Sequence, residues 1–167
     1  GSNFAIKDTV DVENIQITNE QYHWKEAIKA ACAPLLKARH ITERYVNRMI
    51  QAVEEYGTYM VLVDGVAFVH AGSDDDIDND CSAILVLKNP IKFGDRNIKN
   101  VNCIVVIGAK NKDDTNILNL AYIFEKPKNR ELLKKTTLTI EEVQEMNGNM
   151  INDELINCDH IEVKVSC

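Results

Sequence analysis

The sequence is poor in the residues and patterns that mark unusual protein classes. Its 167 residues include three prolines and seven glycines, too few for a collagen-like or linker-like chain. No apolar run approaches the roughly 20 residues of a membrane span, and no stretch has the pattern of a signal peptide. The five cysteines form no C-x-x-C pair, so neither a zinc site nor a thioredoxin-like redox pair is indicated. Reduced thiols in a cytoplasmic protein are expected.

Basic residues are also scarce. Nineteen basic residues face twenty-six acidic ones, which gives a formal net charge of −7. A negative chain is repelled by nucleic-acid phosphates and by anionic membranes, so we expect neither as a partner. A basic protein partner would be attracted instead. The composition, 45% apolar and 27% charged, is that of an ordinary globular domain.

Familiar motifs for cofactors and metals are missing. The sequence contains no G-x-G-x-x-G, G-x-x-x-x-G-K-[ST], H-E-x-x-H or G-x-S-x-G. An acidic stretch holds five aspartates, Asp74, Asp75, Asp76, Asp78 and Asp80. A calcium loop that started at Asp74 would need Gly and Glu where Asn79 and Leu85 stand. We therefore expect no metal and no cofactor, and interpret the acidic loop as a surface for a basic partner.

Hydrophobic periodicity predicts alternating strands and helices. Strands are expected over 13–18, 59–63, 66–69, 83–87 and 101–107, and helices over 24–39, 42–56, 113–124, 130–135 and 139–146. Runs 59–63, 83–87 and 101–107 are expected at the centre of one sheet, with 90–100 irregular and Trp24 buried. This pattern predicts the α/β class: a single-domain sandwich with a mixed central β-sheet and helices on both faces.

The predicted domain does not fill the chain. Gly1-Ser2 resembles an expression scar and no Met follows it, which suggests a piece of a longer protein. We expect a scar and flexible segment over 1–11, the domain over 12–147, and a tail over 148–167. Alternation over 161–165 is typical of a terminal strand within that tail.

One histidine stands apart from the other three. His70 follows an apolar strand and precedes the small residues Ala71 and Gly72. Functional groups in α/β sheets are often presented where strands end. The remaining histidines, His23, His40 and His160, lie near helix ends or in the tail. His70 is therefore the candidate functional residue.

Several segments around His70 resemble one family. The stretch 57–71, GTYMVLVDGVAFVHA, resembles the signature of phosphotransferase-system (PTS) enzyme IIA domains of the mannitol/fructose superfamily. Residues 24–28 resemble the family's W-x-x-A-I helix, and Met49 with Glu54-Glu55-x-Gly57 resembles its ascorbate-type branch. Lys88 to Gly94 and Thr139 to Val143 resemble its later turn and final helix.

The resemblance implies phosphoryl relay through His70. In this family the histidine receives a phosphoryl group from the basic carrier HPr and passes it to a cysteine of an enzyme IIB domain. The family fold is a mixed sheet between helices, and the sugar is bound by the membrane component. Neither the sugar nor the oligomeric state follows from the sequence.

Two departures from the family pattern leave alternatives open. Val69 replaces the usual proline before the histidine, and no histidine lies between His70 and His160, where many members carry a second one. An active carrier is the first hypothesis. The second is a regulatory domain of a PRD-containing transcription regulator, with phosphorylation as a signal or lost. A calcium-binding or purely structural module is the third.

Overall fold

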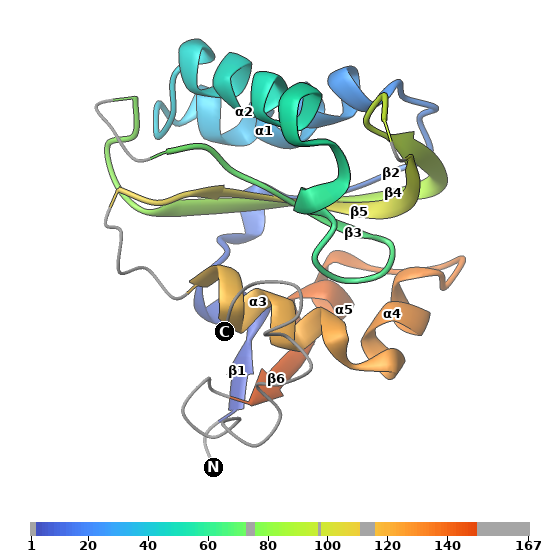
Figure 1. Ribbon diagram of the computed structural model, residues 1–167. Coiled ribbons are helices and arrows are strands. Elements are labelled where there is room, and N and C mark those ends of the chain that lie inside the picture. The colour runs from blue at the N-terminus through green and yellow to red at the C-terminus, as the bar shows by residue number, and fades with distance from the viewer. Residues whose placement is uncertain (1–2, 73–75, 97, 111–115, 150–167) are drawn as a thin grey trace.

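The computed structural model describes residues 3–72, 76–96, 98–110 and 116–149, and shows three layers (Figure 1). A four-stranded sheet lies in the middle, α1 and α2 cover one face, and α3, α4 and α5 lie on the other. Separate hydrophobic clusters fill the two spaces between layers. The predicted α/β sandwich with a mixed sheet is confirmed.

The sheet is mixed because its central pair is antiparallel and its edges are parallel. In the order β2-β4-β5-β3, β4 (Cys81–Phe93) pairs antiparallel with β5 (Lys99–Gly108). The edge strand β2 (Ile15–Thr18) runs parallel to β4, and the edge strand β3 (Val66–Val69) runs parallel to β5. Residues 83–87 of β4 and 103–107 of β5 are apolar and buried on both faces, as expected for strands covered on both sides.

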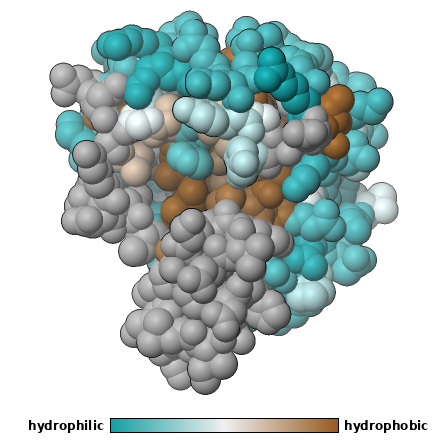
Figure 2. Space-filling view, viewed as in Figure 1, coloured by the Kyte–Doolittle hydropathy of each residue, from teal (hydrophilic) through white to brown (hydrophobic). Residues whose placement is uncertain are grey.

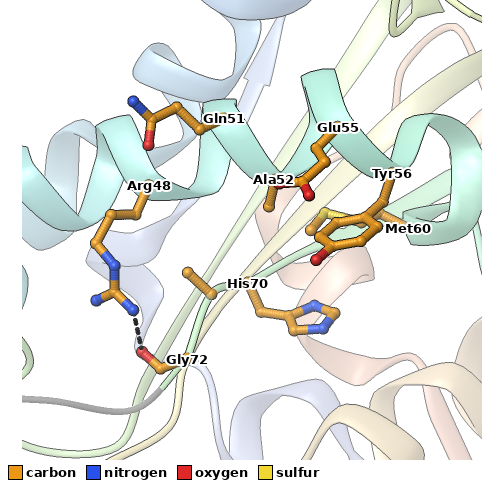
Figure 3. Close-up of a pocket in the computed structure, with 9 residues that line it drawn as sticks. Arg48, Gln51, Ala52, Glu55, Tyr56, Met60, His70 and Gly72 are labelled. Carbon is orange, nitrogen blue, oxygen red and sulfur yellow. Dashed lines mark hydrogen bonds between the residues drawn. The ribbon is translucent and has the colours of Figure 1, made fainter.

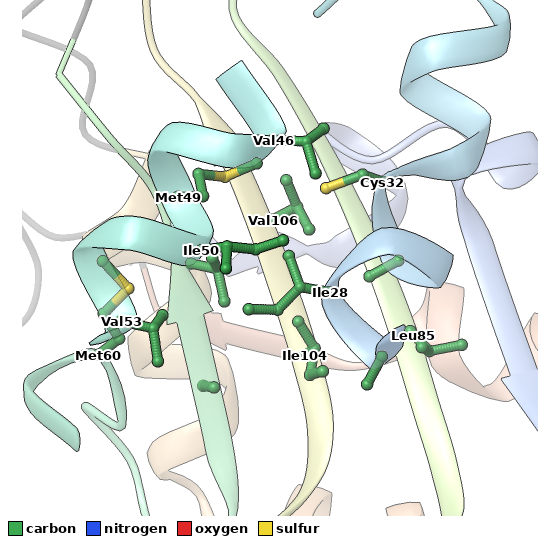
Figure 4. Close-up of a cluster of buried hydrophobic side chains, with 14 of the residues drawn as sticks. Ile28, Cys32, Val46, Met49, Ile50, Val53, Met60, Leu85, Ile104 and Val106 are labelled. Carbon is green, nitrogen blue, oxygen red and sulfur yellow. The ribbon is translucent and has the colours of Figure 1, made fainter. Parts of the chain in front are cut away.

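Two amphipathic helices cover the face toward the functional region (Figure 4). α1 (Trp24–Lys37) and α2 (Glu43–Tyr56) pack side chains such as Ile28, Met49 and Val53 against the sheet. Thr42 caps α2, because its hydroxyl accepts a hydrogen bond from the Tyr45 amide at 3.1 Å. Trp24 is 2% exposed and its Nε1 donates to Asp95 at 3.0 Å, so its predicted burial is confirmed.

Three shorter helices and a small sheet cover the other face. They are α3 (Asn116–Glu125), α4 (Pro127–Leu133) and α5 (Ile140–Glu145), with β1 (Asn3–Ala5) paired to β6 (Asn147–Asn149). A capping box of Thr139 and Glu142 starts α5.

Two predicted segments, one near each end of the chain, lie outside the predicted domain. Residues 3–10, which belong to the segment predicted over 1–11, include strand β1 and buried side chains. Phe4, Ile6 and Val10 are buried there, with two 3₁₀ turns, η1 (Ile6–Asp8) and η2 (Val12–Asn14), leading into β2. The predicted strand over 161–165 lies outside the described residues.

Two predictions about the sheet are wrong. Run 59–63 is not a strand: its start belongs to the 3₁₀ turn η3 (Gly57–Met60), and the place beside β5 is taken by β3. The apolar run correctly indicated that this segment is buried, because residues 60–63 are buried in the structure. A buried segment does not have to pair with a strand, however, and the apolar pattern alone could not decide this. Segment 90–100 is not irregular throughout, because β4 continues to Phe93 after a register shift.

Candidate functional site

The site is a hollow between α2 and the end of β3. Its volume is about 440 Å³. One wall is a helical stripe at spacing i, i+3, i+4, i+7 and i+8, formed by Arg48, Gln51, Ala52, Glu55 and Tyr56. The other residues lining the hollow are Met60, His70, Ala71 and Gly72 (Figure 3). The stripe explains how one helix can present several groups to one strand end.

His70 is partly exposed and its ring is oriented by its own strand. Its Nδ1 lies 3.0 Å from the carbonyl oxygen of Phe68. A carbonyl oxygen can only accept, so Nδ1 carries the hydrogen of this bond. In the neutral ring, Nε2 then holds the free lone pair. Among the described residues, no group forms a hydrogen bond with Nε2.

The backbone after His70 is fixed by a buried tyrosine. The Tyr45 hydroxyl donates to the Ile107 carbonyl oxygen at 2.8 Å and accepts from the Ala71 amide at 3.1 Å. The Tyr45 side chain is fully buried, and this burial raises its pKa to about 12, so the hydroxyl keeps its proton. α2 and the end of β5 therefore share one hydrogen-bonded contact beside His70.

An arginine one turn further along α2 secures the next residue. Arg48 donates from Nη2 to the Gly72 carbonyl oxygen at 3.1 Å, and its guanidinium lies 5.8 Å from the Tyr45 ring centroid. Arg48 also lies 3.6 Å from the Asp76 carboxylate. It is the cationic residue among the described residues that line the hollow.

The described aspartates of the acidic loop contact the chain itself. Asp76 accepts from the Thr42 hydroxyl at 2.9 Å, Asp78 lies 3.2 Å from His40 Nδ1, and Asp80 accepts from the Lys110 amide at 2.6 Å. Backbone bonds also join segment 76–78 to residues 40–42. Asp74 and Asp75 lie outside the described residues. This part of the loop is docked on the start of α2.

The other candidate groups do not gather at the hollow. His23 caps α1 by accepting from the Lys25 amide at 3.3 Å, and His40 pairs with Asp78. Lys110 donates to the Ile77 carbonyl oxygen at 3.3 Å. His160 lies outside the described residues.

A larger hollow, of about 610 Å³, lies between α1 and the segment before β2. It is lined by Asp11, Glu13, Asn14, Gln16, Ala33, Pro34, Lys37, Ala38 and His40. Its histidine ring already contacts Asp78, whereas Nε2 of His70 has no such contact. Size therefore does not select the site, and the chemistry favours His70.

The described part of the chain offers no alternative centre for metal or membrane function. Its His, Cys, Asp and Glu side chains form no group of three or more that could hold a metal ion. None of its helices has the length and apolar character needed to cross a membrane. Burial raises the pKa of Cys32 to about 12 and raises that of Cys103 as well, so these two thiols stay protonated.

Solved structures with this architecture are enzyme IIA domains. A Streptococcus pyogenes chain assigned as a PTS IIA domain superposes with a TM-score of 0.73 at 25% identity, covering 86% of this chain and 94% of that one. IIA of the Escherichia coli complex of enzyme IIA and phosphorylated enzyme IIB for mannitol has a TM-score of 0.69 at 21% identity. It covers 81% of this chain and 94% of its own. The fold is that of PTS IIA domains.

The sequence comparison identifies the family. Residues 8–146 match the family model for the phosphoenolpyruvate-dependent sugar phosphotransferase system, EIIA 2, and the chain belongs to this family. The ascorbate-specific PTS system EIIA component of Shigella boydii is 25% identical over 125 residues, which cover 73% of this chain and 81% of that protein. The corresponding component of Salmonella typhimurium is 23% identical over 133 residues, 77% of this chain and 86% of that protein. A phosphocarrier role in this sugar-transport system follows for the chain.

Sequence reasoning found His70 but missed the residues of α2 around it. Tyr45 lies within the helix predicted over 42–56, but no pattern in the sequence singles it out as part of the site. Arg48 lies three residues after Tyr45, at the border of the apolar face of the helix. A charged residue at this position was the sequence feature that could have pointed to Arg48 as part of the site.

Proposed function

We propose that this chain is a phosphocarrier domain in which His70 accepts a phosphoryl group from HPr and passes it to a cysteine of an enzyme IIB domain. One observation carries the proposal. The His70 ring lies in an open hollow, with Nδ1 held by the Phe68 carbonyl oxygen and Nε2 left as the nucleophile.

The hydrogen bond at Nδ1 supports both steps of the relay. In the first step the Nε2 lone pair attacks phosphorus, a new N–P bond forms, and the P–N bond to the donor histidine breaks. Nδ1 keeps its hydrogen, so the ring bears a positive charge while phosphorylated. In the second step a cysteine thiolate attacks phosphorus, the bond to Nε2 breaks and a P–S bond forms. The ring leaves as neutral imidazole, which is a better leaving group than an imidazolate.

Arg48 supports the proposal electrostatically. It lines the same hollow, and 28% of its side chain is exposed. A guanidinium close to a transferred phosphoryl group stabilises its negative charge. Its contacts with Gly72 and Asp76 keep the side chain at the hollow before any phosphoryl group arrives. Arg48 thus provides positive charge where the sequence lacks the second histidine of many relatives.

The relatives suggest where the carrier works. Their names describe ascorbate-specific components, and we propose that this chain serves a transporter of that branch. The donor and acceptor of the proposed relay act inside the cell, so we propose a cytoplasmic location. In the proposed relay the transported molecule is not bound by this domain.

Phosphorylation in solution tests the proposal. The chain is incubated with enzyme I, HPr and phosphoenolpyruvate, and phosphorus NMR follows the product. We expect an acid-labile phosphoryl group on Nε2, absent in His70→Ala and retained in His23→Ala, His40→Ala and His160→Ala. No label on the wild-type chain, although HPr is charged, would overturn the carrier function. A label on Nδ1 would overturn the proposed roles of the two nitrogens.

A further inference from the structure

Two exposed tyrosines lie at the end of α2 and in the 3₁₀ turn that follows it, and the first of them lines the hollow. Among the described residues, four large apolar or aromatic side chains are more than half exposed: Val12, Tyr56, Tyr59 and Ile98. Tyr56 is 57% exposed at the end of α2, and Tyr59 is 82% exposed in η3. Exposing aromatic rings to water lowers stability relative to burial, so the exposure of Tyr56 and Tyr59 suggests a second function.

The close-up shows that Tyr56 shares the hollow with His70. The rings of Tyr56 and His70 lie on facing sides of the same space, and Met60 lies behind them (Figure 3). Gly57, with φ of 64°, allows the chain to leave α2 and form η3. The turn places Tyr59 three residues after Tyr56. The two tyrosines form what we call the aromatic edge.

The residue types at the hollow and the surface of the molecule suit a protein partner. On the face shown in Figure 2, apolar surface lies near the middle, with polar surface above it. Tyrosine is enriched in interface cores because it combines a large apolar area with few rotatable bonds. Glu55 is exposed on the rim of the hollow, and the whole chain carries −7. These charges complement a basic partner.

We propose that the aromatic edge is the docking anchor for the basic phosphoryl-donor protein. This inference rests on the proposed phosphocarrier function. Phosphoryl transfer requires the phosphorus atom to approach Nε2 to about 3 Å, so the donor must cover the rim of the hollow. Tyr56 lines the hollow, and the exposed Tyr59 follows it three residues later in η3. The rings bind the donor while the imidazole performs the chemistry.

A small phosphoryl donor separates docking from chemistry. Phosphoramidate transfers its phosphoryl group to imidazoles and has no protein surface to dock. We expect Tyr56→Ala and Tyr59→Ala each to lower kcat/KM for transfer from phospho-HPr by about tenfold, through KM. The rate with phosphoramidate should stay at the wild-type value in Tyr59→Ala, and in Tyr56→Ala it should fall far less than the rate with phospho-HPr, because Tyr56 also lines the hollow. Tyr56→Phe and Tyr59→Phe should retain most of the activity with HPr, because the ring carries the contact.

Val12→Ala is the matched control, since Val12 is 51% exposed and lies in η2, away from the hollow. Transfer from HPr at the wild-type rate in the Tyr56→Ala and Tyr59→Ala variants would overturn the inference. An equal loss with phosphoramidate and HPr would also overturn it, because the tyrosines would then shape the site rather than bind the donor. Failure of wild-type phosphorylation by both donors would instead contradict the proposed function.

Discussion

A single hydroxyl group joins three parts of the site. Tyr45 Oη connects α2 to the Ala71 amide, directly after His70, and to the Ile107 carbonyl oxygen near the end of β5. These groups are buried or partly buried, and neither can find water easily if the hydroxyl is removed. Tyr45 therefore contributes to the stability of the fold and to the position of His70 together.

The change Tyr45→Phe tests this contribution. The ring still fills its space, but the Ala71 amide and the Ile107 carbonyl oxygen lose a partner. We expect a loss of about 1–3 kcal/mol in the free energy of unfolding for each group left unpaired. The pH dependence should change as well. The ordinary pKa of tyrosine is 10, and the pKa of Tyr45 in the folded chain is about 12. Because the folded chain holds this proton more tightly than the unfolded chain, the contribution of the raised pKa to the free energy of unfolding is fully present below pH 10.

This part of the stability is lost as the pH rises from 10 to 12, and it amounts to about 2–3 kcal/mol. Urea unfolding at intervals from pH 8 to pH 11 measures it. The curve of Tyr45→Phe should fall less steeply above pH 10 than that of the wild type. Cys32 has a raised pKa as well, and its charge is among the causes that raise the pKa of Tyr45, so it titrates in an overlapping range in both proteins. Parallel curves would show that the Tyr45 hydroxyl does not titrate differently on folding.

At the scale of elements, α1 shows how a neighbouring strand completes a helix. Pro34 lies inside α1 and cannot donate a hydrogen bond to the carbonyl of Ala30. Gln16 of β2 replaces that donor, since its Nε2 lies 2.9 Å from the Ala30 oxygen. The periodicity correctly predicted a helix through Pro34, but the sequence did not show which group satisfies the free carbonyl. That contact spans elements and depends on their packing.

A double-mutant cycle measures the interaction between Gln16 and Pro34. Gln16→Leu should lower the free energy of unfolding by about 1–2 kcal/mol, because the Ala30 carbonyl loses its donor. In a Pro34→Ala background, residue 34 regains an N–H that can bond to Ala30. The same Gln16→Leu change should then cost at least about 0.5 kcal/mol less. Equal costs in the two backgrounds would show that Gln16 stabilises the chain by other contacts.

The failed strand prediction illustrates what periodicity cannot decide. Runs 59–63 and 66–69 are both apolar, and the turn at Asp64-Gly65 joins them as expected, with Gly65 at φ of 80°. Only the second run pairs with β5. The apolar character of a run predicts burial, whereas the choice of partner depends on which run reaches the free edge of the sheet. His70 was still found, because its place after 66–69 did not depend on the first run.

At the scale of the molecule, the sequence indicated the layers and the central histidine but not the surroundings of that histidine. Alternating apolar positions predict which faces are buried, and the two clusters on either side of the sheet agree with that pattern. Arg48 and Tyr45 come to His70 from 22 and 25 residues earlier in the chain. Their approach depends on how α2 crosses the sheet, which no local pattern specifies. The acidic loop was interpreted as a surface for a basic partner, and the structure adds that Asp76, Asp78 and Asp80 contact the chain itself while Asp78 and Asp80 remain exposed.

The net charge leads to the last prediction, which concerns association with a basic donor. A chain of charge −7 attracts such a partner over distances near the Debye length, about 10 Å at 0.1 M salt. The rate of phosphoryl transfer from HPr at low protein concentration should therefore fall as salt rises.

Because the described aspartates of the loop are engaged internally, Glu55 on the rim of the hollow is the better residue to change. Glu55→Gln should slow transfer a few-fold at low salt and converge with the wild type at 0.5–1 M salt, where screening is strong. Glu141→Gln, an exposed change on α5 across the sheet, is the control and should have a much smaller effect. Rapid-quench kinetics at several ionic strengths measure these rates. An effect of Glu55→Gln that persists unchanged at high salt would contradict long-range attraction.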